Sequence, residues 1–152
     1  MEFTHHPERM TDEEWNEAVR GSGAGAGKLV RVYFPNPKAA LLVDPGAGLW
    51  LPWGRRREQP GDWPEGGWAR EESLGKPYWR RWNPEVVVVR PLRWMEKDHT
   101  RTSRWFDLDP GQGILCLCLM AAVGTPLYVV TRPAGGDYLA EVHDRIPVLG
   151  GR

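Results

Sequence analysis

Cysteine, long apolar runs and net charge are all scarce in this chain of 152 residues. The two cysteines, Cys116 and Cys118, stand two residues apart in a strand-like run, so they share one face and are poorly placed to pair. Neither a neighbouring histidine nor a second cysteine pair accompanies them, and we therefore expect no zinc, no other metal and no cofactor. No apolar run nears the ~18 residues of a membrane span and no signal peptide is recognisable, which predicts a cytoplasmic protein without membrane contact.

Familiar catalytic motifs are missing as well. The sequence has no nucleophile elbow of the G-x-S-x-G type, no HExxH zinc-protease pair and no P-loop. The Gly-rich run at residues 21–27 lacks the Lys-Ser/Thr ending of a P-loop and follows no expected strand. Motifs of this kind therefore assign no function to the chain.

Formal net charge is zero, but the basic residues are unevenly distributed. Residues 50–105 hold 12 Lys/Arg against 8 Asp/Glu, together with eight of the nine tryptophans. Cations interleaved with aromatic rings suit single-stranded nucleic acid, because the cations meet phosphates and the rings stack on bases. The alternative is that tryptophan simply fills the core of a small β-rich domain.

Apolar patterning predicts a single domain, residues 1–152, with a mainly β fold. Strands are expected at residues 28–34, 38–43, 85–96, 113–123 and 126–131, with a short strand within 99–109. The run 85–96 opens with four valines after Glu85 and 113–123 is apolar nearly throughout, so both are expected to be buried strands. The predicted class is α+β, mainly β, with a curved or barrel-like sheet and a few short helices.

Helix signals are few. Thr11 as an N-cap and Glu14 at the capping-box position predict one helix within residues 10–20, followed by a flexible connector at 21–27. Residues 69–74 fit one helical turn, and residues 138–149 fit either a short helix or a strand. The segment 50–82, rich in Gly, Pro and Trp, is expected to be an ordered loop region.

Two residues are candidates for proton transfer. His143 lies in an expected loop between an acidic and a basic neighbour, where small changes tune the charge of an imidazole. Glu96 follows a buried strand beside Trp94 and Met95, and apolar surroundings raise the pKa of a carboxyl group. The alternatives are that His143 only closes a loop and that Glu96 is a plain surface residue.

Arginines supply candidate phosphate contacts. Arg70 follows two glycines, which allow another backbone to approach closely, and its guanidinium suits a bidentate phosphate contact. Arg55, Arg56 and Arg57 form a basic cluster in an expected loop. The alternatives are an ion pair between Arg70 and a nearby glutamate, and an ordinary solvated turn for the cluster.

Taken in order, these segments resemble the SOS-response-associated peptidase (SRAP) family, whose members recognise abasic sites in single-stranded DNA. The most specific match is HDRIPVL at residues 143–149, which is similar to the family's terminal His-Asp-Arg-Met-Pro-Val block. Five further segments resemble family segments in the same chain order: 32–43, 51–56, 66–73, 86–96 and 126–136. The likeness runs over roughly residues 28–149 and leaves the expected N-terminal helix and connector outside it.

The resemblance implies roles for individual residues. Glu96 matches the family's glutamate and His143 its histidine, which manage protons while the abasic sugar ring opens and is attacked. In the family, a cysteine directly after the initiator methionine supplies an amine and a thiol that form a thiazolidine with the sugar aldehyde. Here position 2 is Glu2, which also disfavours removal of Met1, and Trp68 stands where the family has a positioning asparagine. A thiazolidine link is therefore not expected.

The leading hypothesis is a monomeric SRAP-like protein of the DNA damage response that binds single-stranded or abasic DNA without a covalent link. DNA contacts are expected from Trp53, Arg55, Arg56, Trp68, Arg70 and Arg145. A second hypothesis is a repurposed SRAP-like scaffold that binds another protein in an accessory or phage-type setting. A third is a hydrolase in which Glu96 and His143 activate water.

Overall fold

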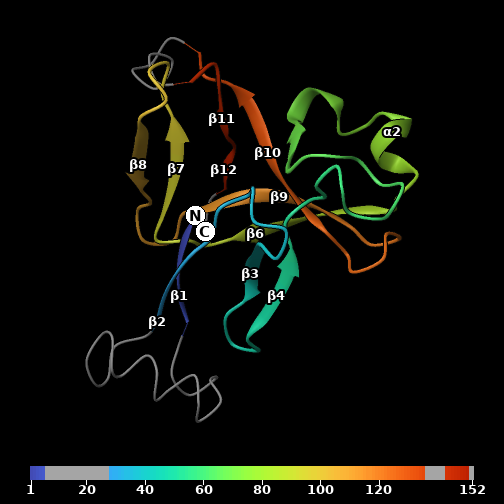
Figure 1. The fold of residues 1–152 in the computed structure, drawn as a ribbon, viewed down its shortest axis with the longest axis horizontal. Helices are drawn as coiled ribbons and strands as arrows, with labels where there is room; N and C mark the ends of the chain where they lie inside the picture. Colours follow the sequence, from blue (N-terminus) through green and yellow to red (C-terminus); the bar gives the residue numbers. More distant parts are fainter. Residues whose placement is uncertain (6–27, 136–142, 151–152) are drawn as a thin grey trace.

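The structure, a computed structural model, describes residues 1–5, 28–135 and 143–150. Strands make up 47% of it and helices 6%, so the prediction of a mainly β fold is confirmed. The described strands form three sheets, which meet near the middle of the molecule in Figure 1. These sheets do not close into a barrel, which corrects the barrel-like form expected from the sequence.

The largest sheet carries the core. Its six strands are β5 (Trp68–Arg70), β6 (Pro84–Val89), β9 (Gly113–Leu119), β10 (Leu127–Pro133), β11 (Arg145–Pro147) and β12 (Leu149–Gly150). Apolar side chains cover both faces of β9, because Cys116 and Cys118 pack in one core cluster and Leu117 and Leu119 in another. The two cysteines are thus unpaired and on one face, as their spacing predicted.

A second sheet brings the N-terminus into the fold. Its order is β2–β1–β7–β8, formed by β1 (Glu2–His5), β2 (Lys28–Arg31), β7 (Arg93–Lys97) and β8 (Ser103–Asp107). Antiparallel pairing sets Glu2 opposite Arg31 on one side and opposite Arg93 on the other. Phe3 is 1% exposed in the core, so a short N-terminal strand of only four residues is anchored firmly.

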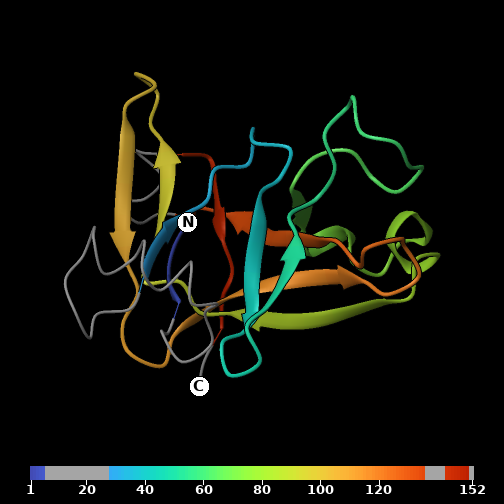
Figure 2. The ribbon, with the colours of Figure 1, turned by 60° about the horizontal axis from the view of Figure 1, so that its bottom comes forward.

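The third sheet is a hairpin of β3 (Ala40–Asp44) and β4 (Leu49–Pro52). Figures 1 and 2 show this hairpin and the β7–β8 hairpin running across the direction of β6 and β9. The chain after β4 forms the expected loop region, which contains β5, a short 3₁₀ turn (Glu71–Ser73) and α2 (Pro77–Arg80). Proline at the first position of α2 favours helix initiation there, a signal that the sequence analysis overlooked.

The expected buried strand at 85–96 proves to be two strands in different sheets. β6 ends at Val89 and β7 begins at Arg93, and Pro91 lies between them. Proline lacks an N–H group and fixes φ, so the run cannot continue as one hydrogen-bonded strand. β6 is also only partly buried, since Val86 is 55% exposed.

Other local predictions are corrected in part. Residues 69–74 contain the end of β5 and a 3₁₀ turn in place of an α-helical turn. The described end of the 138–149 segment forms the short strand β11 and the start of β12. The helix expected within residues 10–20 and the connector at 21–27 lie outside the described residues.

Candidate functional site

A cavity of about 520 Å³ opens where the three sheets meet. Its lining comes from Met1, the segment after β2, Trp53 just after β4, strands β5, β7, β10 and β11, and His143. Glu96, His143, Trp53, Trp68, Arg70 and Arg145 all contribute to it. Six of the eight residues singled out from the sequence as site residues therefore border one space, and only Arg55 and Arg56 do not.

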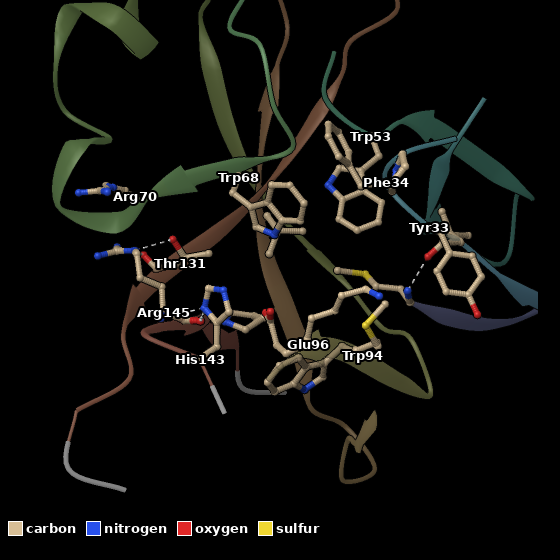
Figure 3. A pocket seen from close by; sticks show the side chains of 17 residues that line it. Tyr33, Phe34, Trp53, Trp68, Arg70, Trp94, Glu96, Thr131, His143 and Arg145 are labelled. Atoms are coloured by element: carbon tan, nitrogen blue, oxygen red, sulfur yellow. Dashed lines mark hydrogen bonds between the residues drawn. The ribbon is translucent and has the colours of Figure 1, made fainter. Parts of the chain in front are cut away.

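Glu96 and His143 lie within electrostatic range of one another in this cavity. Burial raises the pKa of Glu96 to about 7, and the nearby His143 opposes that rise. Figure 3 shows the Glu96 carboxyl group turned toward the side of the cavity that His143 occupies. A carboxyl group that titrates near neutral pH can both release and accept a proton at that pH, which suits acid–base chemistry.

The imidazole of His143 is oriented by the backbone. Its Nδ1 lies 2.8 Å from the carbonyl oxygen of Arg145 and 3.1 Å from the Arg145 amide nitrogen, which donates to it. This contact occupies the Nδ1 edge of the ring, so that Nε2 is the edge directed away from the backbone. The spacing of two residues between His143 and Arg145 therefore lets the Arg145 backbone hold the imidazole ring in position.

Three aromatic rings form one wall. Phe34, Trp53 and Trp68 contact one another edge to face, with ring centroids 4.9–5.6 Å apart. Trp53 is 5% exposed and its Nε1 donates to the carbonyl oxygen of Gly67 at 2.9 Å. Trp68 is 46% exposed, so it is the ring that presents a surface to the cavity opening (Figure 3). Trp53 supports that ring from behind.

Glycines allow this wall to form. Gly54 has a φ of +59°, and a Cβ atom there would lie 2.0 Å from the carbonyl oxygen of Gly66. A Cβ atom on Gly67 would lie 2.7 Å from the ring of Phe34 and 2.8 Å from Nε1 of Trp53. The close backbone contact therefore depends on Gly54, whereas the missing side chain of Gly67 makes room for aromatic rings and a Cβ atom on Gly66 would meet nothing within 4 Å. The expectation that both glycines before Trp68 admit another backbone is not confirmed.

Two of the arginines proposed as DNA contacts are engaged within the loop that follows β4. Arg55 donates to the carbonyl oxygens of Trp63 and Gln59, and Arg56 to those of Phe34 and Trp53. Arg56 is also 7% exposed. These two side chains hold the loop after β4 in shape, and their donors are directed inward.

Arg145 is held at the edge of the cavity. Its guanidinium binds both carboxylate oxygens of Glu72, at 2.5 and 3.4 Å, and also donates to the side chain and carbonyl oxygen of Thr131. Arg70 is exposed, and within the described residues its side chain makes no hydrogen bond or salt bridge, although its charge contributes to the lowered pKa of Glu72. Among the arginines considered from the sequence, Arg57 is also exposed but does not border the cavity, so Arg70 is the one of them that is exposed and borders it.

Met1, which was not among the predicted site residues, also borders the cavity. Its α-amino group is buried and donates to the carbonyl oxygen of Val32 at 2.7 Å. Burial lowers the pKa of this amine to about 6, against the smaller opposing effect of Glu2. The signal was the alternation in Met1-Glu2-Phe3, which is typical of a half-buried strand.

No group of three or more His, Cys, Asp or Glu side chains in the described part of the chain could hold a metal ion. Burial raises the pKa of the Cys116 and Cys118 thiols, which keeps them protonated and poorly nucleophilic. Among the same residues, no helix is long and apolar enough to cross a membrane.

Comparison with known proteins adds no relative. No family model, no curated protein and no solved structure matches this chain.

Proposed function

We propose that this chain is a divergent SRAP-like protein that binds single-stranded DNA, including abasic DNA, in the cavity between its sheets. The observation that carries the proposal is that Glu96 and His143 border the same cavity as the half-exposed Trp68 and the exposed Arg70. A cavity of about 520 Å³ falls within the range of about 300–1,000 Å³ that suits a small ligand. It suits one nucleotide of a single strand better than a duplex.

Each part of the cavity has a role in this proposal. The ring of Trp68 stacks on a base, because every base offers a π-face. In an abasic strand it stacks on the base next to the abasic site. Arg70 on β5 and the exposed Lys97 on β7, which both border the cavity, meet phosphates. Glu96 and His143 contact the sugar and exchange protons with it.

The proposal predicts how strongly the affinity for a single strand depends on salt concentration. Neutralising two phosphates of a single strand gives a slope of about −1.4 in log K against log salt concentration. This is a weak dependence, and it follows from the engagement of Arg55, Arg56 and Arg145 within the fold. Stacking on Trp68 then has to supply a large share of the affinity.

The test is a gel-shift or fluorescence anisotropy titration with intact and abasic single strands at several salt concentrations. Trp68→Ala should weaken binding by about 5- to 150-fold, the equivalent of losing ~1–3 kcal/mol of stacking. Arg70→Ala should reduce the salt slope by about 0.7. Tyr78→Ala and Arg132→Ala are matched controls, since both residues are exposed and neither borders the cavity. Absence of binding at low salt would refute the proposal.

A second candidate function is a scaffold that binds another protein, and one observation favours it. Several basic side chains of residues 50–105 form ion pairs within the protein, including Arg93 with Glu2 and Arg104 with Asp98. Electrostatic attraction to a polyanion is correspondingly small. The same titration separates the two functions, because a scaffold binds neither intact nor abasic single strands.

A further inference from the structure

A second hollow lies outside the cavity between the sheets. It measures about 470 Å³ and is formed by residues within 55–65, in the loop after β4, and within 77–82, which include α2. The two spaces share no lining residue. Figures 1 and 2 both show α2 on the opposite side of the molecule from β7, the strand that carries Glu96. The hollow is therefore a separate candidate for binding, and the function proposed above leaves it unused.

Aromatic rings and prolines from two segments of the chain line the hollow. Trp63 comes from the loop after β4, and Tyr78 and Trp82 come from α2 and the turn that follows it. The rings of Trp63 and Trp82 lie edge to face, with centroids 6.4 Å apart. Tyr78 is 59% exposed. Together with Pro64 and Pro77, these rings leave an apolar surface that is partly open to solvent.

Internal contacts hold this lining in place. The hydroxyl group of Tyr128 donates to the carbonyl oxygen of Pro64, and Arg55 donates to that of Trp63 at 2.8 Å. Trp79 is 4% exposed and packs edge to face against Tyr128, so α2 is anchored by its buried side. A lining that is ordered before a ligand arrives loses less conformational entropy on binding.

Two carboxylates determine which charge the hollow prefers in a ligand. Asp62 and Glu65 border it, both are exposed, and neither side chain forms a hydrogen bond or a salt bridge with the described residues. Arg55 is directed to backbone carbonyl oxygens, and Arg81 lies over the ring of Trp82, 4.8 Å from its centroid. The acidic groups are thus the ones without an internal partner, which favours a positively charged ligand.

We propose that this hollow binds a proline-rich segment of a partner protein in the polyproline II conformation, with a lysine or arginine close to its prolines. Aromatic-lined grooves accept such segments, because the conformation of the ligand is largely set before binding. A polyproline II segment leaves its carbonyl oxygens free, and the indole N–H groups of Trp63 and Trp82 are donors that suit them. The basic residue of the segment meets Asp62 and Glu65. This binding is additional to the DNA binding proposed above and does not depend on it.

Other extended ligands fit this lining less well. None of the residues that line the hollow belongs to one of the described strands, so it offers no strand edge to a β segment. A nucleic acid can stack on the rings, but it brings its phosphates to Asp62 and Glu65. A peptide with prolines and a basic residue satisfies both the aromatic and the acidic part of the lining.

The test is a fluorescence anisotropy titration of the whole chain with labelled peptides of equal length, made of Pro-Pro-Lys, Gly-Ser-Lys or Pro-Pro-Glu repeats. The Pro-Pro-Lys peptide should bind at least about tenfold more tightly than either of the others, because it alone combines proline rings with positive charge. Absence of binding, or equal binding of either control peptide, overturns the proposal.

Variants of exposed residues locate the binding. Tyr78→Ala should weaken binding of the Pro-Pro-Lys peptide by about tenfold, and its exposed ring makes the change compatible with folding. The double variant Asp62→Lys/Glu65→Lys should reverse the preference in favour of Pro-Pro-Glu. Glu85→Lys/Asp109→Lys is the matched control, since these two carboxylates are exposed and lie outside the hollow. The same reversal in the control variant shows that net charge alone decides, and it overturns the proposal.

Single-stranded DNA distinguishes this site from the cavity between the sheets. Trp68→Ala should leave peptide binding unchanged, and Tyr78→Ala should leave the binding of single strands unchanged. Peptide binding without any DNA binding supports the peptide site and refutes the proposed function. DNA that displaces the peptide, with an affinity that Tyr78→Ala lowers, assigns the hollow to nucleic acid and overturns the peptide site.

Discussion

At the scale of single residues, the site is built from groups whose protonation is displaced by burial. Glu96 holds its proton to an unusually high pH and Met1 loses its proton at an unusually low one. The ionised carboxylate is therefore less favourable in the folded chain than in the unfolded one. A group of this kind lowers stability as pH rises from its ordinary pKa of about 4.5 to its folded value of about 7.

Replacing Glu96 by glutamine should therefore stabilise the protein, and only at higher pH. At pH 8 the substitution removes a penalty of up to about 3 kcal/mol, the equivalent of the rise from 4.5 to about 7. At pH 4 the native carboxyl group is already protonated and the difference should vanish. Urea unfolding at both pH values measures this.

Glu85→Gln is the control for that experiment, because Glu85 is exposed on β6. It should change stability by no more than about 0.5 kcal/mol at either pH. A stabilisation by Glu96→Gln that is equal at pH 4 and pH 8 would contradict the argument from burial.

The sequence predicted some of these residues and not others, for physical reasons. His143 and Glu96 could be found because a side chain of suitable chemistry stands at a strand end or in a loop. The place of Met1 in the cavity lining was missed, because the alternation in Met1-Glu2-Phe3 is too short to predict a strand by itself. Nor does a sequence tell which arginines find carbonyl or carboxylate partners, as Arg56 and Arg145 do.

At the scale of elements, most strands could be predicted and their partners could not. β9 and β10 could be predicted because strands that are buried on both faces appear in the sequence as nearly continuous apolar runs. The separation of β6 from β7 was missed because the four valines predict a continuous strand, and the break that Pro91 introduces was not taken into account. The parallel pairing of β5 with β10, which brings Trp68 to the cavity, depends on contacts over about 60 residues and has no local signal.

The element that presents Trp68 should be sensitive to substitution at Gly67. In Gly67→Ala the new methyl group meets Phe34 and Trp53 at 2.7–2.8 Å, so the aromatic wall has to move. We expect a loss of about 1–3 kcal/mol in the free energy of unfolding, together with weaker binding of single strands. Urea unfolding and anisotropy titration measure the two effects.

Gly75→Ala is the matched control, because a Cβ atom at Gly75 meets nothing within 4 Å. It should leave both the free energy of unfolding and the affinity nearly unchanged. If both variants behave alike, the aromatic wall does not depend on the absence of a side chain at Gly67.

At the scale of the whole molecule, the cavity exists because three sheets converge around the N-terminus. Glu2 ties β1 to both of its neighbours, since its carboxylate binds Arg31 at 2.9 Å and Arg93 at 3.1 Å. Hydrogen bonds from Arg93 first, and then from Arg31, lower the pKa of this carboxyl group. Its contribution to stability is present above about pH 4.5 and is lost as pH falls further.

Glu2→Gln should lower the free energy of unfolding, because it weakens the contacts of β1 with both neighbouring strands. The amide keeps the shape but loses the charge that pairs with two arginines, which costs about 1–3 kcal/mol at pH 7. At pH 3 the difference from the unsubstituted protein should be smaller, because the native carboxylate is then partly protonated. Denaturant unfolding at pH 7 and pH 3 checks the sign, and Glu58→Gln, at an exposed position, is the control.

The strand β6 has a consequence for how the protein behaves at high concentration. Among the described strands it pairs only with β9, so the backbone donors and acceptors of its outer side are left at the edge of the largest sheet. Val86, 55% exposed, adds an apolar side chain to this strand. An unprotected edge can template pairing with an extended segment of another molecule. Pro84 and the charged Glu85 disfavour such pairing at the start of β6, so we expect it only along the later part of the strand.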